Sequence, residues 1–185
     1  MSRVVVVGVV ASVVVGGGAL LFALGGGDAE IIGIDARGGS RDVHSQEALD
    51  ELVAQVRAEH GTSEAYDATF YPDRAYVDLH VAGGNGHRYD SYTWDGGDLE
   101  EWSSSGFDEG RTFDLADLDA SRFDGFCDQV KRLVEDPGDC YIIVDPDDVA
   151  GAGGLYSAYI TNEYSEGGYI RFNEVGKEVF RTTWP

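Results

Sequence analysis

The stretch Val4–Leu24, VVVVGVVASVVVGGGALLFAL, decides how the rest of the chain is interpreted. It holds 21 residues without a charge or a proline, and a helix of that length rises about 30 Å, the thickness of the hydrocarbon core of a bilayer. We therefore predict an uncleaved transmembrane helix, with a cleaved signal peptide as the alternative. Arg3 beside the amino terminus predicts a cytoplasmic N-terminus and an extracytoplasmic domain after the membrane.

Small residues recur on one face of this predicted helix. Gly8, Ser12 and Gly16 stand four residues apart, and small residues at that spacing let two membrane helices approach closely. The pattern predicts a weak homodimer through this face.

The charge of the chain excludes one class of partner. There are 34 acidic and 13 basic residues, for a formal net charge of −21. Such a surface repels phosphates, so nucleic acid is excluded as a partner.

The two cysteines, Cys127 and Cys140, stand 13 residues apart. In an oxidising compartment outside the membrane we expect them to form a disulfide.

Periodicity predicts the elements after the tether at 28–44. A helix begins after Ser45, carries apolar residues at a helical spacing and ends at Gly61. Four short strands follow at 68–71, 75–81, 88–94 and 99–102, and a polar connector spans 103–112. A second helix follows Asp119 or Ser121, and four further strands cover 140–144, 155–162, 169–173 and 178–183.

The two halves of this pattern resemble one another. An offset of 74 residues carries Leu49 onto Phe123 and Pro72 onto Pro146, and later positions match at an offset of 80. Such self-similarity is typical of an internal repeat. We predict an α+β fold: an N-terminal transmembrane helix at 1–27, then two tandem copies of a helix plus antiparallel β-meander at 45–112 and 113–185.

This organisation resembles a known group of proteins. Tandem helix-plus-meander halves behind one anchor look like PepSY-type and β-lactamase-inhibitor-type extracytoplasmic modules. The segments 159–163 (YITNE) and 168–170 (GYI), with Gly176, also look like uncharacterised membrane-anchored bacterial domains. The resemblance implies a non-catalytic binding or regulatory domain and brings no catalytic residues with it.

The sequence contains no convincing catalytic or metal-binding motif. The four histidines are not spaced as zinc ligands, and no serine lies in a nucleophile elbow. Asp145, Asp147 and Asp148 crowd one turn, where carboxylates could hold Ca²⁺, yet this composition is also ordinary turn chemistry. We predict no enzyme activity, no cofactor and no metal, and leave open whether these three aspartates bind a cation.

Aromatic residues in the predicted strands are the strongest functional signal. Tyr, Trp and Arg dominate the binding energy of protein interfaces, and a meander covered by a helix on one face leaves its other face open. The function predicted is binding of a protein or peptide partner outside the membrane. The alternatives are a structural accessory subunit of a membrane complex and, third, a hydrolase. The candidate binding residues are Tyr76, Tyr89, Tyr92, Trp94, Tyr156, Tyr159, Tyr169 and Arg171.

Overall fold

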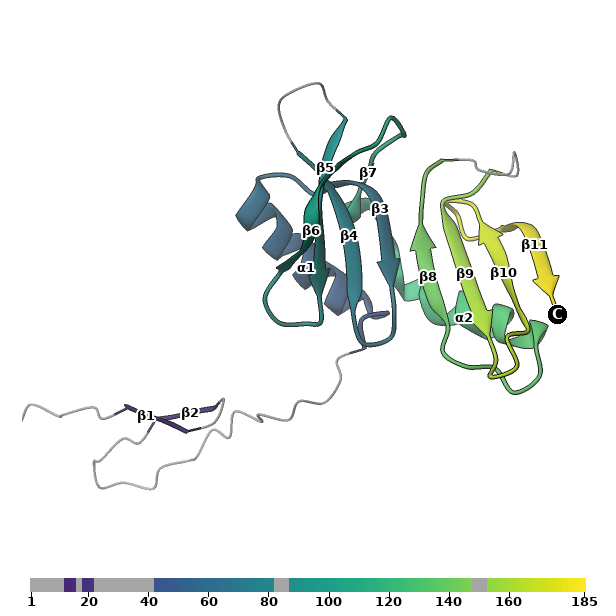
Figure 1. Ribbon diagram of the computed structural model, residues 1–185, viewed down its shortest axis with the longest axis horizontal. Helices are drawn as coiled ribbons and strands as arrows, with labels where there is room; N and C mark the ends of the chain where they lie inside the picture. Colours follow the sequence, from purple (N-terminus) through teal and green to yellow (C-terminus); the bar gives the residue numbers. More distant parts are fainter. Residues whose placement is uncertain (1–11, 16–17, 22–41, 82–86, 148–152) are drawn as a thin grey trace, which may run out of the picture. The chain divides into compact units, whose positions relative to one another are not determined.

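The computed structural model describes residues 12–15, 18–21, 42–81, 87–147 and 153–185. The chain divides into two compact units, Met1–Gly39 and Ser40–Pro185. In the first unit, strand β1 (Ser12–Val15) pairs antiparallel with β2 (Gly18–Leu21) (Figure 1).

The predicted transmembrane helix at Val4–Leu24 is wrong. Its described residues form the β1–β2 pair, and within the described ranges no helix is long and apolar enough to cross a membrane. Nine of the 21 residues are Val and four are Gly; branching at Cβ and the backbone freedom of glycine both disfavour a helix. Of the three predicted helix-pairing residues, Ser12 lies in β1, and Gly8 and Gly16 lie outside the described residues.

The second unit is built on one antiparallel sheet of nine strands. Their order is β11-β10-β9-β8-β3-β4-β5-β6, and β7 pairs with one end of β3 (Figure 1). The strands are β3 (Glu64–Phe70), β4 (Ala75–His80), β5 (Arg88–Trp94), β6 (Glu100–Phe107), β7 (Phe113–Asp114), β8 (Tyr141–Val144), β9 (Tyr156–Thr161), β10 (Gly167–Phe172) and β11 (Glu178–Trp184).

The predicted division into two tandem copies of helix plus meander is wrong, because a single sheet dominates the fold. Strand β3 pairs with β8, with Ala68 opposite Val144 and Phe70 opposite Ile142. This pairing uses strand edges that two separate meanders would leave unpaired, and an unpaired edge leaves backbone groups without partners. Strand β6 also runs to Phe107, so residues 103–107 of the predicted connector belong to an edge strand, and residues 108–112 connect β6 to β7.

Helix α1 (Gln46–His60) forms where the sequence predicts it. Ser45 Oγ accepts a hydrogen bond from the Ala48 N–H at 3.1 Å, which satisfies one of the free amides of the first turn. Gly61 ends the helix with φ 74°, a conformation that favours glycine. The predicted apolar stripe is buried against the sheet: Leu49, Leu52, Val53 and Val56.

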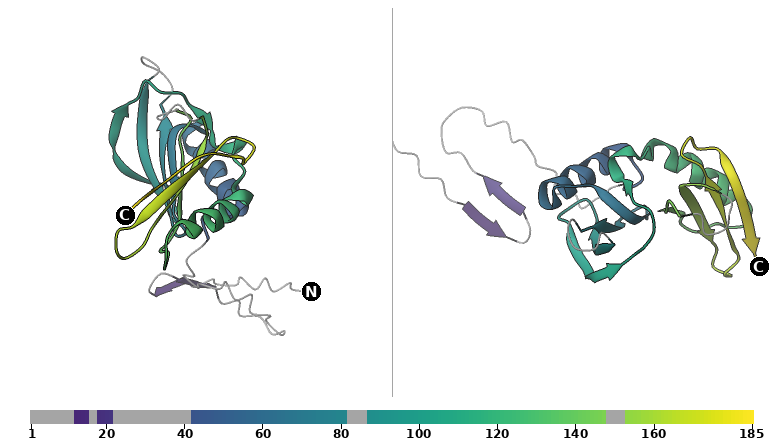
Figure 2. Two further views of the ribbon diagram at one scale, coloured as in Figure 1. Left: turned by 90° about the vertical axis from the view of Figure 1, so that its right-hand side faces the viewer. Right: turned by 90° about the horizontal axis from the view of Figure 1, so that it is seen from above.

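Helix α2 (Phe123–Val130) is the helix of the second half of the sequence. It follows two 3-10 turns, η1 (Leu115–Asp117) and η2 (Ala120–Arg122), and continues into a third, η3 (Lys131–Leu133). Figure 2 shows α1 and α2 on the same side of the sheet.

The predicted disulfide between Cys127 and Cys140 is confirmed, with their Cα atoms 5.6 Å apart. It joins α2 to the residue that precedes β8.

Removal of this disulfide is expected to destabilise the domain. The bridge closes a loop between residues 13 positions apart, so the double variant Cys127→Ser with Cys140→Ser should lose about 3 kcal/mol of unfolding free energy in the chain-entropy account. Urea unfolding with and without dithiothreitol measures it. The reductant should weaken the wild-type protein and leave the double variant unchanged; a wild-type protein indifferent to reduction would contradict the prediction.

Candidate functional site

The two faces of the large sheet have different surroundings. In β4, Ala75, Val77 and Leu79 are buried, whereas the alternate residues are partly exposed. The buried set faces the helices, because successive side chains of a strand point to opposite faces. Both helices lie over that one face (Figure 2). We call the opposite face of the sheet the open face.

A continuous row of seven aromatic rings crosses the open face. Neighbouring ring centroids lie 4.7 to 6.0 Å apart, within the range of favourable ring pairs. Strand register builds its centre: Tyr141 is directly opposite Tyr159, and Tyr159 is opposite Tyr169. We call this row the aromatic stripe. In spatial order it consists of Trp102, Tyr76, Tyr71, Tyr141, Tyr159, Tyr169 and Phe180.

The stripe remains accessible along its length. Trp102, at the edge strand β6, is 63% exposed. The other six rings are partly exposed and none of them is buried. Because each inner ring packs against two neighbours, its exposed surface is presented in a fixed position.

Three carboxylates lie on the open face beside the stripe, and we call them the acidic patch: Asp67, Asp78 and Asp145. Asp67 is directly opposite Asp78 in the β3–β4 register. An irregularity between Ala65 and Asp67 leaves Tyr66 as an extra residue in β3, and such a bulge redirects side chains. The rings of His80 and Tyr89, both on the open face, contact Tyr66 at 5.8 and 6.2 Å.

Several effects together raise the pKa of Asp67 to about 7: burial is the largest, the nearby charges of Asp78, Asp145 and Asp108 add to it, and a hydrogen bond from Thr69 opposes it. Burial also raises the pKa of Asp78, whose carboxylate accepts a hydrogen bond from Ser91 Oγ at 2.6 Å. The two carboxylates therefore repel one another in an environment that solvates charge poorly.

Burial also raises the pKa of Asp145, while the Arg171 guanidinium opposes that rise. The patch thus holds three carboxyl groups that all ionise less readily than usual.

Arg171 occupies the open face next to the stripe but is only 4% exposed. Its strand register places it opposite Ser157, which is opposite Ile143. Its Nη2 donates to the backbone carbonyls of Asp145, Asp147 and Gly154 at 3.0 to 3.3 Å. Among the described residues its Nε has no hydrogen-bond partner. A buried N–H of this kind retains the capacity to bind an acceptor.

Four of the eight predicted binding residues lie with their rings on the open face. Tyr76, Tyr159 and Tyr169 belong to the stripe. Tyr89 lies apart from it, in the group with Tyr66. With Arg171, these positions form the part of the prediction that the structure brings to one surface.

The remaining three predicted residues lie on the helix-covered face. Trp94 is 2% exposed, and its indole N–H donates to Gln55 of α1 and to the Gly97 carbonyl. Tyr156 is 1% exposed beneath α2. Tyr92 packs on His60, with ring centroids 4.7 Å apart. These three side chains pack against the helices, so the surface described here does not include them.

Sequence reasoning missed four members of the stripe: Tyr71, Tyr141, Trp102 and Phe180. Each of the four lies within a strand that the sequence predicts. Their proximity depends on pairing across the whole sheet, and above all on the β3–β8 pair, which brings Tyr71 within 5.0 Å of Tyr141.

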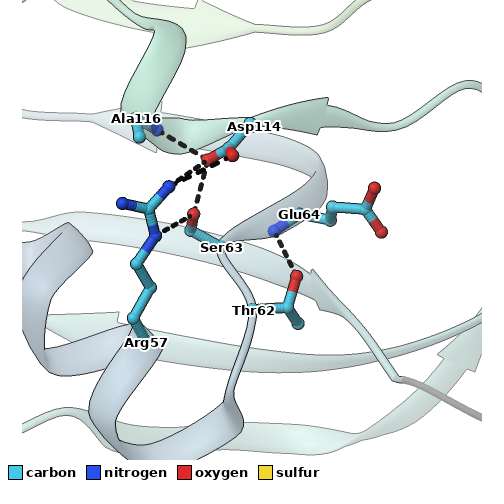
Figure 3. A network of polar contacts seen from close by, with 6 residues as sticks. All are labelled: Arg57, Thr62, Ser63, Glu64, Asp114 and Ala116. Atoms are coloured by element: carbon cyan, nitrogen blue, oxygen red, sulfur yellow. Dashed lines mark hydrogen bonds and ion pairs between the residues drawn. The ribbon is translucent and has the colours of Figure 1, made fainter.

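A separate polar cluster lies at the end of α1 (Figure 3). Arg57 Nε donates to Ser63 Oγ at 2.9 Å, Ser63 Oγ donates to the Asp114 carboxylate, and that carboxylate also accepts from the Ala116 N–H at 2.9 Å. The Ser63 hydrogen bond is the largest of the effects that lower the pKa of Asp114. Ser63 is 2% exposed, so this cluster ties α1 to β7 and η1 rather than presenting a nucleophile.

Within the described ranges, no group of three His, Cys, Asp or Glu side chains is placed to hold a metal ion. Asp148, the third residue of the crowded turn, lies outside those ranges. Asp145 instead accepts a hydrogen bond from the Asp147 N–H at 2.7 Å, which is ordinary turn chemistry.

Comparison with known proteins identifies one uncharacterised relative. No family model matches the chain, and no solved structure matches it. An uncharacterised protein of Mycobacterium tuberculosis (strain CDC 1551 / Oshkosh) is 29% identical over 143 residues, which cover 71% of this chain and 47% of that protein. The chain therefore spans about half the length of this relative. The resemblance to PepSY-type and β-lactamase-inhibitor-type modules stays a prediction.

Proposed function

We propose that this domain is a non-catalytic binding module that holds a protein or peptide partner on the open face of its sheet. The observation that carries the proposal is the aromatic stripe: seven contiguous rings on the face opposite both helices. Tyr and Trp supply large rigid contact area at a low entropic cost and are enriched among the residues that dominate interface energies.

Cross-strand stabilisation alone accounts poorly for the whole stripe. Isolated ring pairs stabilise a sheet without forming a continuous row, whereas this row passes without a break from β6 to β11, the two edge strands. Its most exposed member, Trp102, contacts one ring of the row and adds little packing. A row of this kind suits an extended partner lying across the strands.

We also propose that the module works in an oxidising compartment outside the cytoplasm. The support for this is the Cys127–Cys140 bridge, because disulfides persist in such compartments and are rare in the cytosol.

Selection from a random peptide library displayed on phage tests the binding proposal. We expect enriched peptides to bind the wild-type domain and to lose at least about tenfold in affinity for Tyr159→Ala and for Trp102→Ala, since truncation of an interface ring commonly costs more than 1 kcal/mol. Trp102→Ala is informative even if Tyr159→Ala folds poorly, because Trp102 is 63% exposed.

Tyr164→Ala is the matched control. Tyr164 is 70% exposed and lies outside the stripe, in the loop between β9 and β10. Its truncation should leave the affinity of the selected peptides unchanged. Peptides that bind all three variants as well as the wild type, or a library that yields no binder, would contradict the proposal.

A further inference from the structure

We infer that the segment bound on the open face is cationic and places a Lys or Arg side chain at the acidic patch of Asp67, Asp78 and Asp145 while its backbone lies along the aromatic stripe. This inference rests on the proposed function and specifies the chemistry of the partner.

The first support is a repulsion between two carboxylates of the sheet that no described cation compensates. Asp67 and Asp78 are directly opposite one another, an arrangement that destabilises an antiparallel pair. Their polar partners in the described part of the chain are hydroxyls: Thr69 Oγ1 at 3.5 Å from Asp67 and Ser91 Oγ at 2.6 Å from Asp78. None of the ion pairs between described residues includes either aspartate. A cation from a partner would remove this repulsion.

The second support is the position of the patch relative to the rings. Tyr76 is opposite Thr69 in the β3–β4 register, close to the Asp67–Asp78 pair. An ammonium or guanidinium group beside both carboxylates and the face of an aromatic ring gains from charge attraction and from the cation–π interaction together. Rings and carboxylates on one face are thus complementary to a basic side chain on an apolar or extended segment.

The third support comes from Arg171. It is 4% exposed on the same face, and its Nε has no acceptor among the described residues. A backbone carbonyl of a bound segment is a neutral acceptor of the type that this N–H lacks. The face therefore presents carboxylate acceptors for a basic side chain, next to an arginine whose Nε has no acceptor among the described residues.

The charge of the whole chain acts in the same direction. At a formal net charge of −21, the molecule attracts basic partners over long distances and repels acidic ones. Long-range attraction alone would bind any polycation, so the test must separate the acidic patch from the general surface.

Fluorescence anisotropy with defined peptides makes that separation. The probe is a peptide of about ten residues that alternates Lys and Val, and a Gln–Val peptide of the same length is its neutral counterpart. At about 150 mM salt, where exposed charges farther apart than the Debye length are screened, we expect the basic peptide to bind at least about tenfold more tightly. The double variant Asp67→Asn with Asp78→Asn should remove that advantage.

The control is Asp124→Asn with Asp128→Asn, which removes the same charge from exposed positions of α2. It should change the affinity less than about twofold, because surface charges on the helix side are screened. Equal weakening by both double variants would mean general attraction and would overturn the inference. If library peptides bind through the stripe but the Lys–Val peptide shows no preference over the Gln–Val peptide, this inference fails while the proposed function stands. If no peptide of any kind binds, both fail.

Discussion

Replacement of Phe123 by Ala is expected to lower the free energy of unfolding by about 3–5 kcal/mol, the range for a fully buried Phe. Phe123 is 0% exposed, and its ring lies 5.3 Å from Phe70 of β3 and 6.0 Å from Tyr156 of β9. It therefore packs against β3 and β9, the two strands that flank β8. Removal of the ring would leave a cavity between β3 and β9. Because both strands belong to one sheet, neither can move alone to fill it.

Urea unfolding followed by both fluorescence and circular dichroism measures this effect. A single sheet with one core predicts one transition, at the same midpoint for both probes, shifted to lower urea in the variant. Phe107→Ala is the matched control, because Phe107 is 58% exposed on the edge strand. A loss of unfolding free energy below about 1 kcal/mol for Phe123→Ala would be no larger than that of a surface substitution. It would mean that packing of Phe123 against the sheet does not stabilise the fold.

The second large effect has the opposite sign: Asp67→Asn is expected to stabilise the protein. The pKa of Asp67 is raised from 3.8 to about 7 on folding, so the folded state binds a proton more tightly than the unfolded state. The carboxylate is therefore neutral at no cost below pH 3.8 and destabilises the fold increasingly as the pH rises toward 7. This rise in the pKa corresponds to a destabilisation of about 4 kcal/mol above pH 7.

Thermal or urea unfolding as a function of pH checks this prediction. The gain of Asp67→Asn should be about 2–4 kcal/mol at pH 8 and fall below about 1 kcal/mol near pH 4. Asp128→Asn, an exposed change on α2, should stay within about 0.5 kcal/mol at both pH values. A destabilised Asp67→Asn variant at pH 8 would show that the carboxylate is favourably solvated in the folded state.

At Asp67, therefore, stability and binding oppose one another. A residue whose removal strengthens the fold needs another reason to be present, and such residues are typical of functional sites. On the open face that reason is the proposed basic side chain of a partner. Asp67→Asn should then give a more stable protein that binds the Lys–Val peptide less well.

Local signals in the sequence predicted local structure well. Ser45 and Gly61 mark the ends of α1 because capping depends on residues a few positions apart. The predicted strand at 88–94 coincides with β5, whose residues are rich in Tyr and Trp. The disulfide was also predicted correctly, since two cysteines allow a single pairing.

Long-range pairing could not be predicted from the same signals. The β3–β8 register joins residues more than 70 positions apart, and no periodicity within either strand reports it. The internal similarity of the two halves therefore suggested separate copies where the structure has a continuous sheet. At Val4–Leu24 the absence of charge predicts a membrane helix, whereas the Val and Gly content disfavours a helix.

For the same reason, only part of the candidate surface could be predicted from the sequence. Tyr76, Tyr159 and Tyr169 were identified by residue type, but Trp94 and Tyr156 share that type and are buried under the helices. Strand alternation alone does not say which face a helix will cover. Only the helix positions assign the faces, and only the full strand order makes the rings contiguous.

An NMR titration shows whether the open face of the sheet is the binding surface. The isotope-labelled domain is titrated with the Lys–Val peptide, and the shifts of its backbone amides are mapped on the structure. We expect saturable shifts confined to the strands that carry the stripe and the acidic patch, centred on Asp67, Tyr141 and Tyr159. Shifts centred on the exposed sides of α1 and α2, or spread evenly over the acidic residues of the chain, would contradict it.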